Sequence, residues 1–217
     1  MIRKSIHTIE GKLECVSGLR IGGSQESLQI GGTDLPVIKH PVTHAPYVPG
    51  SSLKGKMRSE LEKRLGKFGG RGEKQGTEPC DCAGRDCPIC RVFGPHKKPE
   101  SQLGPTRIIV RDGRLLEGGD IEIKTENVIN RKTGAAEHPR KLERVAADSK
   151  FDLQVRVQVY DLDDAFQFDG KHGGEAILAV VRQALGFVEQ TGLGAGVSRG
   201  SGQVRLLDLK LDGAPWQ

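Results

Sequence analysis

The sequence is short of aromatic side chains, since 2 Tyr, 6 Phe and 1 Trp make up 4% of its 217 residues. Proteins that hold single-stranded nucleic acid by stacking need several exposed rings on one surface. So small a supply of rings argues against a base-stacking platform. If the chain binds nucleic acid, we expect contacts to the phosphates to dominate.

Long apolar runs are also missing, because no stretch approaches the roughly 20 residues that cross a bilayer. The first residues lack the apolar core of a signal peptide. We therefore expect a soluble, cytoplasmic protein with no membrane partner. The Walker pattern is absent too, and the glycine-rich stretch at 192–202 follows a predicted helix, so it is not a dinucleotide-binding fingerprint.

The charge balance favours an anionic partner. The formal net charge is +5 and the isoelectric point is about 9.0. The length suffices for one domain with a substantial core, or for one domain that carries large insertions.

The hydrophobic pattern predicts an α+β protein in the order strand, helix, strand, strand, helix, strand. Apolar residues alternate at 7–15 and at 151–159, and helical spacing appears at 53–65 and 177–188. Further strands are predicted at 106–111, closed by a turn at 112–113, and at 204–211, with a bulge at 206–207 where the alternation slips. This order predicts a ferredoxin-like core. We expect a single domain over 1–217, with a cysteine segment inserted at 67–105 and a ribbon at 120–148. The ribbon has a basic tip and an irregular return arm at Pro139.

A Pro-Gly turn precedes the first predicted helix, with Ser51 or Ser52 as its expected N-cap and a stop near Gly66. Lys54 and Arg58 place two cations close to the positive end of the helix dipole, where acidic residues are normally favoured. A bound phosphate would relieve this conflict. A basic, solvated helix face explains the same residues equally well.

Four cysteines follow the pattern C-x-C-x4-C-x2-C: Cys80, Cys82, Cys87 and Cys90. Four thiolates at this spacing can surround one tetrahedral Zn²⁺, and the segment has too few apolar residues to fold unaided. His96 is an alternative ligand, and a redox pair at Cys87 and Cys90 is the rival interpretation. Cys15 is expected in the core.

The glycine stretch at 192–202 is interpreted as a main-chain loop that closely approaches an RNA phosphate, with Ser198, Arg199 and Ser201 as side-chain contacts. A flexible connection between helix and strand is the alternative.

Six motifs occur along the chain in a fixed order: GLRIGG, GGTDLPVIKHP, YVPGSSLKGKMRSELE, CPICRVFG, ENVINRKTG and GLGAGVSRGSG. Together they resemble the backbone subunit of the type III-A CRISPR (Csm) effector, within the RAMP superfamily. The resemblance covers nearly the whole chain. It implies a ferredoxin-like (RRM-like) core and a subunit that polymerises along a guide RNA (crRNA), with copies of itself and other effector subunits as partners. It also implies a β-hairpin thumb that kinks the guide–target duplex, and target RNA cleavage with Mg²⁺ or another divalent cation.

The resemblance assigns site residues position by position. Asp34 takes the catalytic position; from sequence alone, a turn residue after two glycines is the competing interpretation. The implied RNA-binding residues are Arg20, Ser51, Ser52, Lys54, Arg58, Arg131, Gly194, Gly196, Ser198, Arg199 and Gly200.

Two rival functions follow from the same sequence. One is a non-catalytic scaffold that binds crRNA and leaves cleavage to its partners. The other is a metal-independent guide-processing ribonuclease of the RAMP superfamily, with His7, His40 or His44 as general base.

Overall fold

The computed structural model describes residues 1–22, 35–70 and 74–216, so Asp34 lies outside the described residues. Its main sheet runs in the order β11-β10-β1-β7-β4-β2, and β3 pairs with β7 beside this path. Every pair of neighbouring strands in it is antiparallel. The strands are β1 (Arg3–Cys15), β2 (Tyr47–Val48), β3 (Ile108–Val110), β4 (Gly113–Glu117), β7 (Lys150–Tyr160), β10 (Val204–Leu211) and β11 (Ala214–Pro215).

The two longest strands of this sheet confirm the alternation seen in the sequence. In β1, Ile9, Leu13 and Cys15 are each at most 1% exposed, and Phe151 and Val155 of β7 are buried on the same face. Fully burying each large side chain of this kind stabilises the fold by about 1.5–3 kcal/mol. Cys15 is therefore a core residue, as predicted, and burial raises the pKa of its thiol to about 12.

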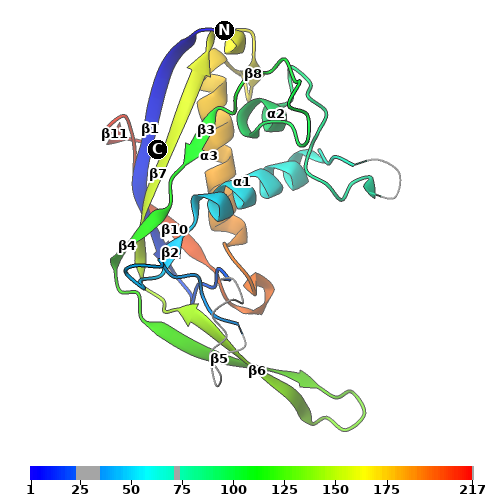
Figure 1. Cartoon of the computed structure of the whole chain (residues 1–217), viewed down its shortest axis with the longest axis vertical. Helices are drawn as coiled ribbons and strands as arrows, with labels where there is room; N and C mark the ends of the chain where they lie inside the picture. Colours follow the sequence, from blue (N-terminus) through cyan, green and yellow to red (C-terminus); the bar gives the residue numbers. More distant parts are fainter. Residues whose placement is uncertain (23–34, 71–73, 217) are drawn as a thin grey trace.

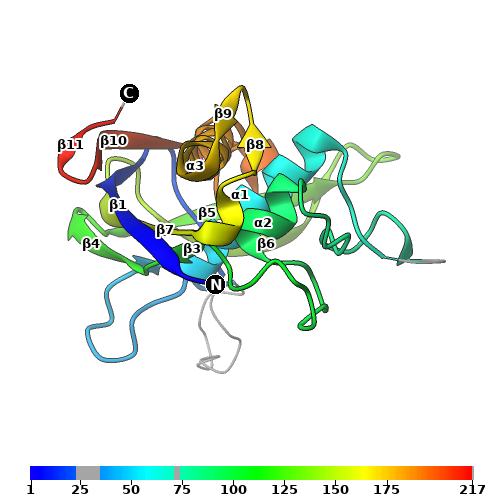
Figure 2. The same cartoon turned by 90° about the horizontal axis from the view of Figure 1, so that it is seen from above.

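Two helices, α1 (Gly50–Leu65) and α3 (Gly173–Thr191), lie on the same face of the sheet (Figures 1 and 2). The apolar stripe predicted at 177–188 is buried along α3. A short third helix, α2 (Pro88–Phe93), packs beside α1 and α3. The architecture is a mixed α/β fold, with the core between one sheet and one helical layer. None of the described helices is long and apolar enough to cross a membrane.

The start of α1 differs from the prediction. The helix begins at Gly50 and its cap residue is Pro49, so the assignment of Ser51 or Ser52 as N-cap was wrong. The Gly50 N–H donates instead to the carboxylate of Asp112, 2.7 Å away. Gly50 also packs so closely on the main chain of Val110 that a Cβ would collide with its carbonyl oxygen. The local sequence could not show this partner, because it comes from 62 residues further along the chain.

The end of α1 agrees with the prediction, because the helix stops at Leu65 and Gly66 adopts a left-handed φ of 61°. Its inward stripe of Leu53, Met57 and Leu61 is at most 2% exposed.

Two edge details also differ from the prediction. The strand expected at 106–111 is shorter, and the chain does not turn back at 112–113 but continues into β4, so that β3 and β4 both pair with β7. The predicted bulge in β10 is present slightly later than expected. Glu10 pairs with Lys210 and Lys12 with Leu207, which leaves Gly11 opposite two residues, 208–209.

A separate two-stranded ribbon, β5 (Ile121–Ile129) and β6 (Ala136–Val145), projects from the body (Figure 1). Its register shifts between Glu126 and Val128, opposite Pro139, so the predicted irregularity of the return arm is confirmed. The remaining described elements are short: the pair β8 (Gln167–Phe168) and β9 (Lys171–His172), and the 3-10 helices Asp161–Asp163 and Val197–Arg199.

Candidate nucleic-acid interface and metal centre

The four predicted cysteines come together at one point. Their sulfur atoms all lie within 4.8 Å of one another. The Sγ–Sγ separations are 3.7 Å from Cys80 to both Cys82 and Cys90, 3.9 Å from Cys80 to Cys87 and 3.7 Å from Cys82 to Cys90. A tetrahedral zinc ion with Zn–S bonds of about 2.3 Å requires sulfurs about 3.8 Å apart. The cluster therefore fits a metal such as zinc.

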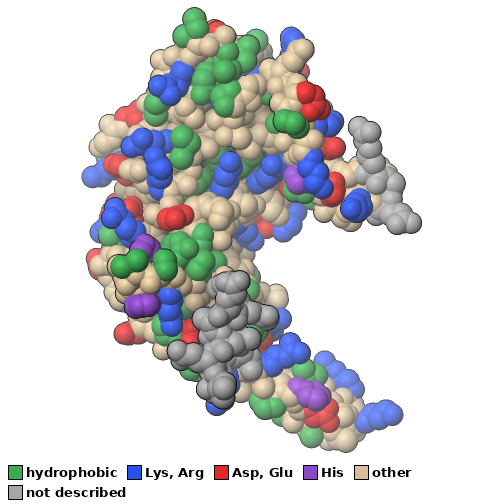
Figure 3. All heavy atoms as spheres, viewed as in Figure 1, with side chains coloured by type: hydrophobic (Ala, Val, Ile, Leu, Met, Phe, Trp, Pro, Cys, Tyr) green, Lys and Arg blue, Asp and Glu red, His purple; other side chains and the backbone are tan. Residues whose placement is uncertain are grey.

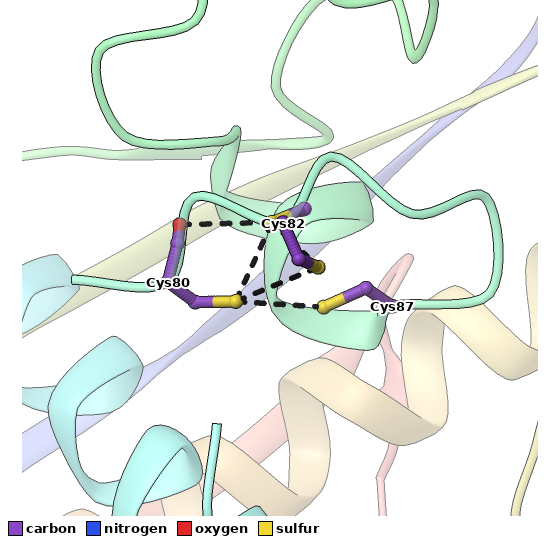
Figure 4. Close-up of side chains that lie close together, drawn as sticks. Cys80, Cys82 and Cys87 are labelled. Carbon is purple, nitrogen blue, oxygen red and sulfur yellow. Dashed lines mark hydrogen bonds between the residues drawn. The ribbon is translucent and has the colours of Figure 1, made fainter. Parts of the chain in front are cut away.

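The chain around the cluster aims the sulfurs inward. Cys87 is the cap residue of α2 and Cys90 lies in its first turn, so both ligands stand at one end of a short helix. The sulfur atoms of Cys80 and Cys87 point toward each other across the cluster (Figure 4). Hydrogen bonds, the strongest from the Cys90 thiol, lower the pKa of Cys87 to about 5, which favours a thiolate ready to bind metal. His96 is not a member of this group among the described residues; its main-chain N–H donates to the Cys80 carbonyl.

A buried ionic cluster joins α2 to the sheet. The Asp163 carboxylate accepts from Arg107 Nη2 at 2.7 Å and lies 3.3 Å from Arg91 Nη1. The side chains of Asp163 and Arg107 are fully buried, and that of Arg91 is 6% exposed. Arg91 directly follows Cys90, so this cluster anchors the helix that supplies two of the four thiols.

The glycine loop at 192–202 is ordered by contacts with the segment that follows β1. The Ala195 N–H donates to the Arg20 carbonyl at 2.8 Å, and the Gly202 N–H donates to Gly18 at 2.9 Å. Gly194 has a φ of 78°, and a Cβ on it would collide with the Arg20 carbonyl oxygen. The sequence therefore needs glycine here for a specific conformation, and the flexible-connection interpretation does not describe this loop.

The base of the ribbon meets the same two segments. Arg144 of β6 donates to the Ser201 hydroxyl at 3.1 Å and pairs with Glu122 at 2.6 Å. Lys124 of β5 donates to the Arg199 carbonyl at 2.5 Å. Leu19 forms paired main-chain hydrogen bonds with Val145. Three segments that are far apart in the sequence thus form one basic junction.

The predicted RNA-binding residues at this junction differ in their exposure and in the partners that they already have. The main chain of Arg20 is fixed, whereas its Nε is buried without a hydrogen-bond partner among the described residues. Arg199 is 60% exposed and forms an ion pair with Glu126 at 2.9 Å. Ser198, Gly194 and Gly200 are exposed.

The predicted residues of α1 form a second group. Ser51 is exposed and Ser52 is half-buried. The Lys54 side chain is half-buried and makes no hydrogen bond or ion pair with another described side chain; burial, and then the neighbouring Arg58 cation, lower its pKa. Arg58 is already engaged, because it binds both the Glu62 carboxylate and the Cys80 carbonyl at 2.8 Å.

One face of the molecule is hollowed. Figure 3 shows the hollow between the body and the projecting ribbon, with Lys and Arg side chains on both sides of it. Arg131 lies in the exposed loop at the ribbon tip. The structure brings Arg20, Arg199 and the glycine loop into one junction, whereas Arg131 lies on the ribbon and Lys54 lies on α1.

Two of the histidines proposed as alternative bases, His7 and His40, already have hydrogen-bond partners. His7 is held by Asp212 at 2.7 Å and by Ser5 at 2.9 Å in the outer half of β1. Eight residues of extended strand, or about 26 Å, separate His7 from Cys15, the end of β1 that leads to the junction. His40 accepts from the main chain of its own turn, at Val42 and Thr43.

Two features of this site were not predicted from the sequence. One is Glu62, which joins Arg58 to Cys80. The other is the ribbon base, where Arg144 and Lys124 hold the glycine loop. The sequence signal for Glu62 was weak: two pairs of opposite charge at helical spacing, Lys56–Glu60 and Arg58–Glu62.

Comparison with known proteins places this arrangement in a class. The family model of the RAMP superfamily matches residues 12–205. The chain therefore belongs to the RAMP superfamily.

Individual relatives narrow the assignment from the superfamily to one family. The chain is 37% identical to the "CRISPR system Cms endoribonuclease Csm3" of Methanothermobacter thermautotrophicus, over 96% of this chain and 86% of that protein. It is 36% identical to the protein of the same name from Streptococcus thermophilus, over 89% of this chain and 84% of that protein. The crystal structure of a Csm3-Csm4 subcomplex in the type III-A CRISPR-Cas interference complex matches with a TM-score of 0.60 and 26% identity, over 97% of this chain and 80% of that chain. The chain belongs to the Csm3 family.

Proposed function

We propose that this chain is a guide-RNA-binding backbone subunit of a type III-A CRISPR effector that cleaves target RNA within the assembled complex. The observation that carries the proposal is the similarity, over 96% of the chain, to a protein named as a Csm3 endoribonuclease. The basic junction and the hollow beside it supply a surface suited to a nucleic-acid backbone.

In this proposal the guide lies against the junction. The main-chain N–H groups of the glycine loop approach phosphates closely, because glycine leaves no side chain in the way. Arg199 and Ser198 are exposed on that loop, and Arg20 lies directly beneath it. With aromatic residues at only 4%, affinity rests on phosphate contacts, which do not distinguish sequences.

We assign a second set of guide contacts to the first turns of α1, through Ser51, Ser52 and Lys54. Lys54 has no competing anionic partner among the described side chains, which supports this role. The projecting ribbon is assigned as the thumb, with Arg131 at its tip reaching the guide–target duplex.

Cleavage is assigned to Asp34 on the strength of its sequence position alone. The target ribose 2′-OH loses its proton and attacks the adjacent phosphorus, while the bond to the 5′ oxygen breaks and that oxygen is protonated. The products are a 2′,3′-cyclic phosphate and a 5′-OH end. A carboxylate at position 34 can accept the proton or hold a divalent cation, and bound Mg²⁺ would neutralise charge on the phosphate.

We assign the cysteine cluster to a structural zinc ion. Four thiolates fill all four tetrahedral positions, so no position remains for water or substrate. We further propose that the core is ferredoxin-like and forms a single domain with two insertions. The strand order β10-β1-β7-β4, with α1 and α3 on one face, supports this assignment.

Copies of the chain along one guide, and other effector subunits, are the proposed protein partners. A further structural match, the Type III-B Cmr-beta complex bound to cognate target RNA, has 17% identity and a TM-score of 0.60 and supports the fold alone.

The test of the enzymatic assignment is cleavage of an end-labelled target RNA by assembled complex that contains wild-type or Asp34→Ala chains. We expect cuts at regular spacing with wild-type chains, and their loss in the Asp34→Ala complex and in EDTA, while target binding is retained. Asp34→Asn is the shape-preserving control and should also be inactive. Full cutting by the Asp34→Ala complex would leave a scaffold, and cutting of repeat RNA in EDTA would favour guide processing.

A further inference from the structure

Arg58 and Glu62 form a closed set of three hydrogen bonds with Cys80, a member of the cysteine cluster. Arg58 Nε donates to Glu62 Oε1 at 2.8 Å, and Arg58 Nη2 donates to the Cys80 carbonyl at 2.8 Å. The Cys80 N–H donates to the same Glu62 oxygen at 2.8 Å. Two side chains one helical turn apart on α1 therefore hold both main-chain polar groups of one metal-ligand residue.

Because the side chains of Arg58 and Glu62 are largely buried, water has little access to replace these hydrogen bonds. The side chain of Glu62 is 7% exposed and that of Arg58 is 17% exposed. Two other ion pairs lie on the same helix: the side chains of Lys56 and Glu60 are 22% and 9% exposed, and Lys63, which also pairs with Glu60, is 58% exposed. The Arg58–Glu62 pair is the most withdrawn from solvent of these three described pairs.

Removing Glu62 leaves the Arg58 charge without its carboxylate and the Cys80 N–H without its acceptor in a shielded place. Removing Arg58 leaves the Glu62 charge without its cation, and the Cys80 carbonyl keeps only its other donors, such as the His96 N–H.

Cys80 depends on this support more than Cys87 and Cys90 do. Cys87 and Cys90 are placed by α2, which Arg91 anchors to Asp163. Cys80 follows a segment without regular structure and has no helix or strand of its own. The position of its sulfur is therefore set mainly by the hydrogen bonds to its main chain.

We propose that Arg58 and Glu62 are positioning residues that fasten the cysteine metal centre to α1. Groups that orient a metal ligand without touching the metal commonly contribute about 10–100-fold to metal affinity. Arg58 thereby serves the metal centre, and Lys54 is left as the cation of this helix that is available to an RNA phosphate. The inference does not rest on the proposed function, because metal retention is measured without RNA.

The experiment compares the rate at which purified, zinc-loaded chains release zinc to a chromogenic chelator. Glu62→Gln keeps the shape of the side chain but loses the charge that holds Arg58. Arg58→Lys keeps the charge but loses the guanidinium, which donates to two acceptors at once. Both should release zinc at least about tenfold faster than wild type. Arg64→Ala is the matched control, since Arg64 is an exposed arginine on the same helix and its loss should leave the rate unchanged.

A second measurement separates this role from phosphate binding. Guide-RNA affinity is titrated against salt for zinc-loaded Arg58→Lys, Arg58→Ala and wild-type chains. We expect the salt slope to stay at the wild-type value in both variants, because Arg58 meets no phosphate in this assignment. Far-UV circular dichroism checks that each variant is folded, and if Arg58→Ala does not fold, the zinc-release rates of Arg58→Lys and Glu62→Gln decide the proposal.

Zinc release from Glu62→Gln and Arg58→Lys at the Arg64→Ala rate would overturn the inference. So would a salt slope that falls by about one unit in Arg58→Ala, since that marks a lost phosphate contact. Failure of RNA binding in wild-type chains would contradict the proposed function and leave the zinc result intact.

Discussion

Replacing Gly194 with alanine perturbs the glycine loop where it lies closest to the segment after β1. Gly194 has a φ of 78°, a left-handed conformation that costs alanine roughly 1–2 kcal/mol. The added Cβ would also meet the Arg20 carbonyl oxygen and approach the Leu19 side chain to 3.3 Å. Overpacking of this kind costs about 1–3 kcal/mol more.

Gly200 is a matched control within the same loop. Its φ is 80°, but a Cβ there would meet nothing within 4 Å. Gly200→Ala therefore carries the conformational cost of roughly 1–2 kcal/mol without the collision. The difference between the two variants isolates the contact between the glycine loop and Arg20.

The assay is thermal unfolding of both variants beside wild type. For a chain of this size each kcal/mol lowers the midpoint by about 2–4 °C, so Gly194→Ala should melt at least about 2 °C below Gly200→Ala. Guide-RNA affinity should fall in Gly194→Ala as well, because the bond from the Ala195 N–H to Arg20 is displaced. Equal midpoints for the two variants would refute the argument that close approach, and not φ alone, requires glycine at 194.

Elemental analysis should find one zinc per chain; a chain without zinc, or an intact fold after serine replaces all four cysteines, would contradict the structural role of the metal centre. Asp163→Ala should lower stability by about 3–5 kcal/mol because it leaves two buried arginines unpaired, whereas the exposed Asp164→Ala should change it by about 0.5 kcal/mol or less in the same unfolding assay. Lys54→Ala should weaken binding of all guide sequences alike and flatten the salt slope by about one, and a loss confined to particular guides would show base recognition instead. Because burial raises the pKa of Cys15 to about 12, iodoacetamide at pH 8 should leave Cys15 unmodified in the folded chain, and rapid labelling would show that its thiol is accessible.

The sequence predicted those parts of the fold that depend on local periodicity. The alternation at 151–159 and the helical stripe at 177–188 became β7 and α3, and Gly66 ended α1 as expected. The four cysteines could be assigned to one centre because their spacing within eleven residues already limits the geometry.

Long-range partners account for what the sequence did not predict. The N-terminus of α1 is capped by Asp112 from beyond β3, so the local preference for serine was overridden. The basic junction depends on contacts such as Arg144 with Ser201, which are 57 residues apart. The engagement of Arg58 with Cys80 likewise spans 22 residues, and a helical cation gives no sign of it. The assignment of Asp34 stays a prediction, because it lies outside the described residues.

In the proposed function, this chain binds a guide RNA within a multi-subunit effector. The most direct measurement is the RNA content of complex purified through a tag on this chain, after washing in moderate salt. We expect a small RNA of fixed length, protected from added ribonuclease by the subunits along it. A complex without RNA, or with RNA fragments of random length, would contradict the binding of a guide RNA by this chain.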